Sequence, residues 1–175
     1  MTVSVIQLAL PTSKQILTTL EVGQELRLSG DIYTMRDAGH IRCLDLLEQA
    51  GQLPFNLAGQ ALFYAGPTPA LASQPFGAIG PTTAARMDVA AVRLYRAGIQ
   101  ATLGKGRRSA AVEQACRECL SVYLVTVGGA AALLARHVVS SELVAWPDLG
   151  SEALYRLKLQ DFPAWVAIDT TGRQL

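Results

Sequence analysis

The feature that most constrains the fold of this 175-residue chain is the alternation of strand-forming and helix-forming segments in its second half. Runs with the composition of buried or half-buried strands occur at 61–65, 99–103, 121–127, 138–146 and 164–169. Segments with the apolar spacing of helices separate them, at 82–97, 109–120, 130–136 and 150–158. Strands that alternate with helices are typical of α/β domains, so we expect an α/β fold.

The first sixty residues contain the same kinds of segment. The pattern predicts a short helix at 12–20, two strands at 25–29 and 31–34, and a helix that follows Met35–His40 and ends near Ala50. No linker, low-complexity tract or internal repeat interrupts the chain. Because 175 residues are enough for one hydrophobic core, we expect a single domain that spans residues 1–175.

Composition narrows the possible partners and the compartment. Hydrophobic residues make up 50% of the chain and charged residues 17%, which indicates extensive burial or a surface made for a partner. The net charge of +1 gives no reason to expect binding to nucleic acid or to an anionic membrane. Residues 1–11 carry no basic group before an apolar run that is too short to span a bilayer. We therefore expect a cytoplasmic protein with no membrane association.

The three cysteines are an odd number, which fits a reducing compartment better than a disulfide scaffold. Cys116 and Cys119 have the spacing of some metal ligands, but no second pair accompanies them. They fall on one face of a predicted helix, and Cys43 stands alone in another. We favour buried thiols over metal ligands and assign no metal site to this chain.

A loop that turns sharply into a helix is predicted at Gly77–Asp88. Gly80-Pro81 is a turn dipeptide, and Thr82 and Thr83 are residues that can cap a helix N-terminus with their hydroxyls. Arg86 would then stand in the first helical turn, where a cation opposes the positive end of the helix dipole. An anion such as a carboxylate or a phosphate would compensate for this placement. In the alternative, the helix is simply capped and Arg86 pairs with Asp88 or with solvent.

Two further cations stand at similar junctions. Arg36 precedes a predicted helix, where it could bind an anion or form a local network with Asp37, and the neighbouring His40 fits a structural role. Lys105 lies on a Gly-Lys-Gly turn after a predicted strand, the end of the strand at which open α/β sheets place ligands. This turn lacks the spacing of a phosphate-binding Walker loop, and a solvated basic turn is its simpler interpretation.

Four blocks of the sequence resemble the β subunit, or fused C-terminal domain, of the iron–sulfur (class I) fumarate hydratases and L(+)-tartrate dehydratases. The blocks are Gly30–His40, Gly80–Asp88, Gly104–Gly106 and Gly128–Leu134. Trp146–Gly150 and Asp161–Pro163 extend the likeness, which covers nearly the whole chain from about residue 13. The Gly-Pro-Thr-Thr and Arg-Met-Asp elements of the second block are specific, whereas the Gly-Lys-Gly turn alone is weak.

The resemblance implies a swivelling β/β/α fold and the reversible addition of water to a four-carbon dicarboxylate. It also implies a hetero-oligomer in which an α subunit, and not this chain, binds a 4Fe-4S cluster that acts as a Lewis acid. By the same resemblance, Arg36, Arg86 and Lys105 bind the substrate carboxylates, and Thr82 transfers a proton at the adjacent carbon. None of the three cysteines falls in a matching block.

Two departures from the family pattern leave the substrate open. Ala85 stands where the family commonly has glycine, and Gly39 stands where it often has alanine. The run Gly128–Ala132 is closer to the fumarase branch, so we expect fumarate and L-malate as substrates, with L(+)-tartrate as the alternative. A non-catalytic domain that binds an anion or supports a partner is the more remote alternative. Convergence of the three cations in the fold would argue against it.

Overall fold

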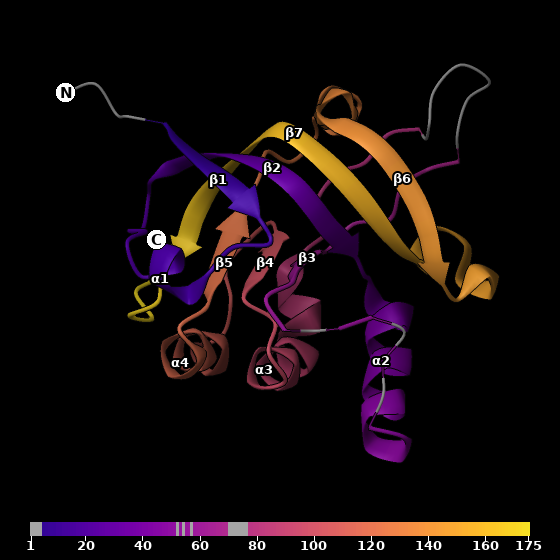
Figure 1. Cartoon of the computed structure of the whole chain (residues 1–175), viewed down its shortest axis with the longest axis horizontal. Coiled ribbons are helices and arrows are strands. Elements are labelled where there is room, and N and C mark those ends of the chain that lie inside the picture. Colours follow the sequence, from indigo (N-terminus) through magenta and orange to yellow (C-terminus); the bar gives the residue numbers. More distant parts are fainter. Residues whose placement is uncertain (1–4, 52, 54, 57, 70–76) are drawn as a thin grey trace.

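The computed structural model describes residues 5–51, 53, 55–56, 58–69 and 77–175, and its central feature is a sheet that closes on itself. The strands are β1 (Ile6–Leu10), β2 (Glu25–Thr34), β3 (Ala61–Phe63), β4 (Ala101–Gly104), β5 (Val122–Val125), β6 (Val138–Ala145) and β7 (Leu154–Ile168). Their order is β1-β2-β3-β4-β5-β7-β6, and β2 also pairs with β7. This extra pairing closes β2, β3, β4, β5 and β7 into a small barrel, and β1 and β6 extend it (Figure 1).

Helices cover one side of this barrel, so the protein is of the mixed α/β class that the alternation predicts. The helical elements are α1 (Lys14–Leu17), α2 (Asp37–Gln49), η1 (Ala84–Met87), α3 (Asp88–Arg96), α4 (Ala110–Cys119), α5 (Ala131–Leu134), η2 (Ala135–His137) and η3 (Pro147–Glu152), where η marks a 3₁₀ turn. Figure 1 shows α2, α3 and α4 on the same side, below β3, β4 and β5. None of the helices in the described ranges combines the length and apolar character that crossing a bilayer requires.

Strands β2, β3, β4 and β5 run parallel to one another. Their carboxyl ends therefore meet at one edge of the barrel, and the loops that follow them leave from the same place. In sheets of this kind, ligands bind at the carboxyl ends of the strands. We call this region the carboxyl edge.

Residues alternate between two hydrophobic cores along the central strands. Ala61 and Phe63 belong to the core inside the barrel, whereas Leu62 belongs to the layer between the sheet and the helices. The rings of Phe63 and Phe162 meet edge to face inside the barrel, with centroids 5.6 Å apart. Because both faces of these strands are buried, their sequences are continuously hydrophobic, as predicted for 61–65 and 121–127.

The predicted helix at 150–158 is wrong, because η3 ends at Glu152 and most of this segment belongs to β7. Leu157 and Leu159 are buried while Arg156 and Lys158 are exposed, which is the period-two pattern of a half-buried strand. This stretch of β7 pairs with β2 on one side and with β6 on the other. Pairing with two neighbouring strands thus outweighs the local helical tendency of the segment.

Strand β2 is continuous, although the sequence predicts two strands interrupted at Gly30. The strand bends at Gly30, where φ is +113° and the register with β7 shifts. A Cβ atom at this position would lie 2.0 Å from the carbonyl oxygen of Leu10. Glycine is therefore required here, because β1 approaches the backbone too closely for any side chain.

Candidate functional site

The four site residues that the sequence predicts all follow parallel strands at the carboxyl edge. Arg36 comes two residues after β2, and Lys105 follows β4 directly. Thr82 lies in the segment that crosses the end of β3, where it contacts Tyr64, and Arg86 lies in η1. The connections that follow β2, β3 and β4 thus bring three cations and a hydroxyl to one end of the barrel.

Thr82 and Lys105 are joined through their backbones. The amide of Lys105 donates to the carbonyl of Thr82 (3.3 Å), and the amide of Ala84 donates to the carbonyl of Lys105 (3.0 Å). Thr83 and Lys105 form an isolated parallel bridge between these hydrogen bonds. The threonine segment therefore behaves as a short extra strand beside the end of β4, which fixes the relative positions of Thr82 and Lys105.

The hydroxyl of Thr82 does not cap a helix. Its Oγ1 donates to the carbonyl oxygen of Tyr64 (2.9 Å), and its backbone amide donates to the same oxygen (2.8 Å). Thr83 precedes η1 but makes no side-chain hydrogen bond to it, and α3 begins only at Asp88. The predicted threonine caps are therefore wrong, because these residues pair with neighbouring segments. The hydroxyl proton of Thr82 points at a carbonyl, which leaves the oxygen lone pairs free to accept a hydrogen bond.

Arg86 pairs with Asp37 and not with Asp88. Its Nε lies 3.1 Å from Oδ1 of Asp37, and its Nη2 donates to Oδ2 of Asp37 at 3.1 Å. Asp37 opens α2, so this two-point contact connects η1 to the first turn of that helix. The Arg86 side chain is 49% exposed, and the contact uses one edge of its guanidinium group. The other edge, at Nη1, is directed away from Asp37 and can serve a ligand.

Arg36 is held at the start of α2 by a loose ion pair and by close packing. Its Nη2 lies 3.7 Å from Oε1 of Glu152, and the other oxygen of Glu152 accepts from the amide of Ala38 (2.8 Å). Glu152 thus caps α2 in place of the Arg36 side chain. A Cβ at Gly66 would lie 3.0 Å from Cδ of Arg36, so glycine at position 66 leaves the room that this arginine occupies.

Lys105 is exposed and crosses the loop that follows β5. Its Cδ lies 3.6 Å from the position that a Cβ of Gly128 would take. Within the described ranges, no carboxylate lies within ion-pair distance of its ammonium group. Of the three cations, Lys105 is therefore the one whose charge remains uncompensated by this part of the chain, and it is available to an anionic ligand.

Asp37 and Glu152 are the members of this arrangement that sequence reasoning missed. Asp37 was considered only as a local partner of Arg36, and its side chain instead reaches residue 86. Glu152 lies 114 residues from Ala38, the residue whose amide it accepts, so no local pattern could have indicated the contact. The two carboxylates reduce the local charge of the three cations to one net positive charge.

His40 is buried beneath the carboxyl edge and serves the fold. Its Nδ1 lies 2.8 Å from the carbonyl oxygen of Arg36, and its ring lies 5.3 Å from that of Tyr64. Burial lowers the pKa of His40 to about 4, although its hydrogen bond to Arg36 acts in the opposite direction. The imidazole is therefore neutral at physiological pH, in agreement with the structural role that we favoured.

The cysteines do not fit the ligand set of an iron–sulfur cluster. Cys43 lies in α2 while Cys116 and Cys119 lie in α4, and burial raises the pKa of Cys43 to about 11 and that of Cys116 to about 12, so both are neutral thiols in this fold. Cys119 is partly buried in the same helix as Cys116. In the described part of the chain, no three His, Cys, Asp or Glu side chains gather as a metal site would require. We derive no chemistry of this chain through a cluster of its own.

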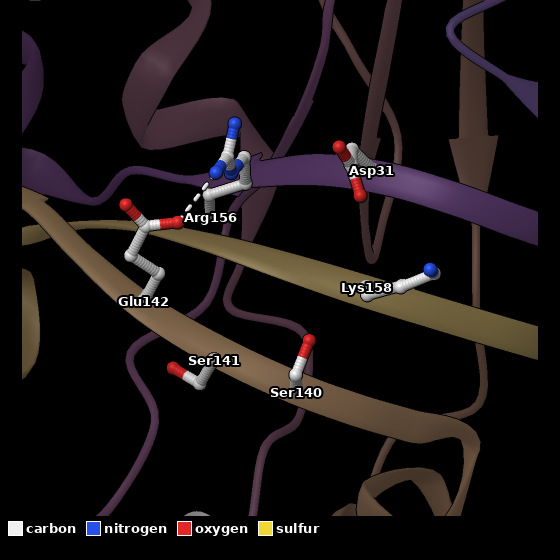
Figure 2. Close-up of a pocket in the computed structure, with 6 residues that line it drawn as sticks. All are labelled: Asp31, Ser140, Ser141, Glu142, Arg156 and Lys158. Carbon is white, nitrogen blue, oxygen red and sulfur yellow. Dashed lines mark hydrogen bonds and ion pairs between the residues drawn. The ribbon is translucent and has the colours of Figure 1, made fainter.

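A hollow of about 400 Å³ lies elsewhere, on the outer face of β2, β6 and β7 (Figure 2). It is lined by Asp31, Ser140, Ser141, Glu142, Arg156 and Lys158. Its charges are of both signs, and Nη2 of Arg156 donates to Glu142 at 2.5 Å across the strands. None of the predicted site residues lines it. The mixed charges of this outer hollow cancel within it, so the carboxyl edge is the better candidate for an anion site.

Comparison with known proteins places the chain among hydro-lyase sequences. All of residues 1–175 match the family model described as fumarase C-terminus. The chain is 38% identical over 164 residues to the class I, anaerobic fumarate hydratase of Escherichia coli, a match that covers 91% of this chain and 30% of that protein. It therefore spans less than a third of the curated fumarate hydratases to which it is similar.

Two shorter relatives match over most of their length. The putative L(+)-tartrate dehydratase subunit beta of Methanocaldococcus jannaschii is 35% identical over 169 residues, with 93% of this chain and 87% of the relative covered. The L(+)-tartrate dehydratase subunit beta of Escherichia coli is 31% identical over 173 residues, with 96% of this chain and 85% of the relative covered. The likeness to these two relatives thus covers nearly the whole of this chain.

Proposed function

This chain belongs to the fumarase C-terminus family, and from that premise we propose that it acts as the β subunit of an iron–sulfur hydro-lyase. The proposed reaction is the reversible hydration of fumarate to L-malate in the cytoplasm. The active site would be shared with an α subunit that binds a 4Fe-4S cluster, in a hetero-oligomer of α and β chains. We further propose that residues 1–175 form one domain with the swivelling β/β/α fold of that family.

The observation that carries this proposal is the gathering of Arg36, Arg86 and Lys105 at the carboxyl edge. A C4 dicarboxylate has two anionic ends, and the planar fork of arginine matches a carboxylate with two parallel hydrogen bonds. Asp37 occupies one edge of the Arg86 guanidinium and holds the group in place, which leaves the other edge for substrate. Lys105 adds a point charge where negative charge develops on the intermediate.

Thr82 is the proposed proton-transfer group. Its hydroxyl is held at the carboxyl edge by the Tyr64 carbonyl, and its segment is bound to that of Lys105. A backbone carbonyl cannot take up the hydroxyl proton and favours the neutral form of the threonine. Proton transfer therefore requires the hydroxyl to leave this carbonyl while nearby cations lower its pKa, an effect that exclusion of water strengthens by weakening the screening of their charges. The proposed α subunit would complete such a closed, cationic site.

The test is a substrate panel on the purified complex of this chain with its cluster-bearing α subunit, prepared without oxygen. We expect turnover of fumarate and L-malate, and we expect none from this chain alone after attempted cluster reconstitution. A preference for L(+)-tartrate by tenfold in kcat/KM, about 1.4 kcal/mol of transition-state discrimination, would reassign the substrate. Turnover by the isolated chain would contradict the shared site, and absence of turnover by the complex would contradict the hydro-lyase function.

A further inference from the structure

A fully buried arginine lies directly beneath the proposed site. The side chain of Arg108 is 0% exposed, and its Nε donates to Oδ1 of Asp88 at 2.6 Å. Its guanidinium carbon lies 5.2 Å from the ring centre of Tyr64 and 4.7 Å from that of Tyr123. Burial of a cation lowers stability unless the cation is paired with an anion or contacts aromatic rings. Arg108 has both kinds of partner, the Asp88 carboxylate and the faces of Tyr64 and Tyr123.

Asp88 binds the same segment a second time. Its Oδ2 accepts from the backbone amide of Ser109 at 2.7 Å, so the carboxylate contacts residues 108 and 109 together. Asp88 is the first residue of α3 and follows η1, which carries Arg86. This pair of hydrogen bonds thus connects the start of α3 to the loop that begins with Lys105.

The two tyrosines connect Arg108 to the remaining parts of the site. Tyr64, over whose ring Arg108 lies, offers its carbonyl oxygen to the hydroxyl and the amide of Thr82. Tyr123 donates its hydroxyl to the carbonyl of Gly106 at 3.0 Å, directly after Lys105. The backbone of Lys105 is bonded to the threonine segment, whereas the next residue of the turn, Gly106, has φ of +85° and is exposed. The Tyr123 hydroxyl therefore supports the half of the turn that the threonine segment does not reach.

We propose that Arg108 and Asp88 are positioning residues that hold Lys105 in its place opposite Thr82 and Arg86. This inference rests on the proposed hydro-lyase function, and neither residue is assigned a contact with substrate. Arg108 belongs to the loop after β4, and from there it contacts two other segments of the carboxyl edge: the end of β3 through Tyr64 and the start of α3 through Asp88. Since a displacement of about 1 Å in a reacting group can cost on the order of 10²-fold in rate, such a tether has a direct effect on catalysis.

The test is a double-mutant cycle in the assembled α/β complex, with Arg108→Lys measured in the wild-type and in the Lys105→Ala background. We expect Arg108→Lys to lower kcat about tenfold in the wild-type background, and to have little further effect once the Lys105 ammonium is absent. Tyr123→Phe tests the same proposal if Arg108→Lys does not fold. It keeps the ring and removes only the hydroxyl that binds Gly106. It should lower kcat about threefold and show the same dependence on Lys105.

The matched control is Glu118→Gln, which breaks the exposed ion pair between Arg96 of α3 and Glu118 of α4. It should leave kcat and KM unchanged, and melting temperatures are recorded for every variant. Equal losses from Arg108→Lys and Tyr123→Phe with and without Lys105, or melting shifts without kinetic loss, would overturn the positioning role. In that case the wild-type complex would still turn over substrate. An inactive wild-type complex would instead overturn the proposed function, and this inference with it.

Discussion

The carboxyl edge and the outer hollow both gather charged side chains, but they do so in different ways. In the outer hollow, Arg156 and Glu142 come from neighbouring strands and neutralise each other, as cross-strand pairs on a solvent face commonly do. At the carboxyl edge, cations come from loops that follow separate parallel strands, and Lys105 stays exposed beside Thr82. The charges that line the outer hollow sum to zero, whereas those of the carboxyl edge leave one net positive charge after Asp37 and Glu152 are counted. The comparison teaches that an excess of positive charge, and not volume alone, makes a region a candidate for an anion site.

The largest expected difference between these regions is in the free energy of unfolding that is lost when an arginine is replaced. Arg108→Met leaves Asp88 as a partly buried carboxylate without its partner, and we expect it to lower the free energy of unfolding by about 3–5 kcal/mol. Arg156→Met on the outer face should change stability little, because that ion pair is exposed to solvent. Denaturant unfolding of both variants measures the contrast. Similar losses for the two variants would show that the buried Arg108–Asp88 pair contributes no more to stability than the exposed pair of the outer hollow does.

The next effect concerns the dependence of stability on pH through His40. The folded pKa of His40 is about 4, below the unfolded value of 6.5, so its neutral form stabilises the fold above pH 6.5. That contribution to the free energy of unfolding is lost as pH falls from about 6.5 to about 4. The total loss at the lower end of this window is roughly 3 kcal/mol by linkage.

The pH dependence of unfolding measured for wild type and for His40→Gln tests this expectation. The variant should show a flatter decline over this pH window, because it lacks the group that gains a proton on unfolding. A decline that His40→Gln leaves unchanged would assign the acid sensitivity to other groups.

A catalytic role for Thr82 predicts a change in rate and not in binding. Thr82→Val keeps the shape and removes the hydroxyl, so kcat of the complex should fall by about 10²-fold or more with KM little changed. Thr82→Ser, which restores a hydroxyl, is the matched control and should recover much of the rate. If the hydroxyl only supports the backbone of Tyr64, the valine variant will melt earlier and retain its kcat, which would remove Thr82 from the catalytic residues.

The smallest expected effect is a change in KM, which compares the arginines of the two regions by their part in substrate binding. Arg86→Lys and Arg36→Lys replace a planar fork by a point charge, and each should raise KM about tenfold with a smaller loss of kcat. Arg156→Lys in the outer hollow should leave KM unchanged. Steady-state kinetics of the three variants in the assembled complex provide the measurement. A change in KM for Arg156→Lys as large as that for Arg86→Lys would move the candidate site to β2, β6 and β7.

The sequence predicts the strands of the central sheet well, because their hydrophobic runs are short and are bounded by glycine or proline. Val122 and Leu124 belong to one core while Tyr123 belongs to the other, as a strand buried on both faces requires. The helix predicted from residue 82 begins later, because backbone bonds to Tyr64 and Lys105 hold the threonine segment in an extended form. The helix predicted at 150–158 fails because strand pairing is decided by neighbours that are distant in the chain.

By itself, the sequence determined that cations would stand at glycine-flanked junctions between strands and helices, since turn chemistry and hydrophobic periodicity are local properties. Only the tertiary structure decided their partners. Arg86 binds Asp37, 49 residues away, and Asp88 is thereby left for Arg108. Local spacing had suggested Asp88 as the alternative partner of Arg86. The physical reason is that an ion pair requires proximity in space, and the closed barrel brings the loops of separate parallel strands to one edge.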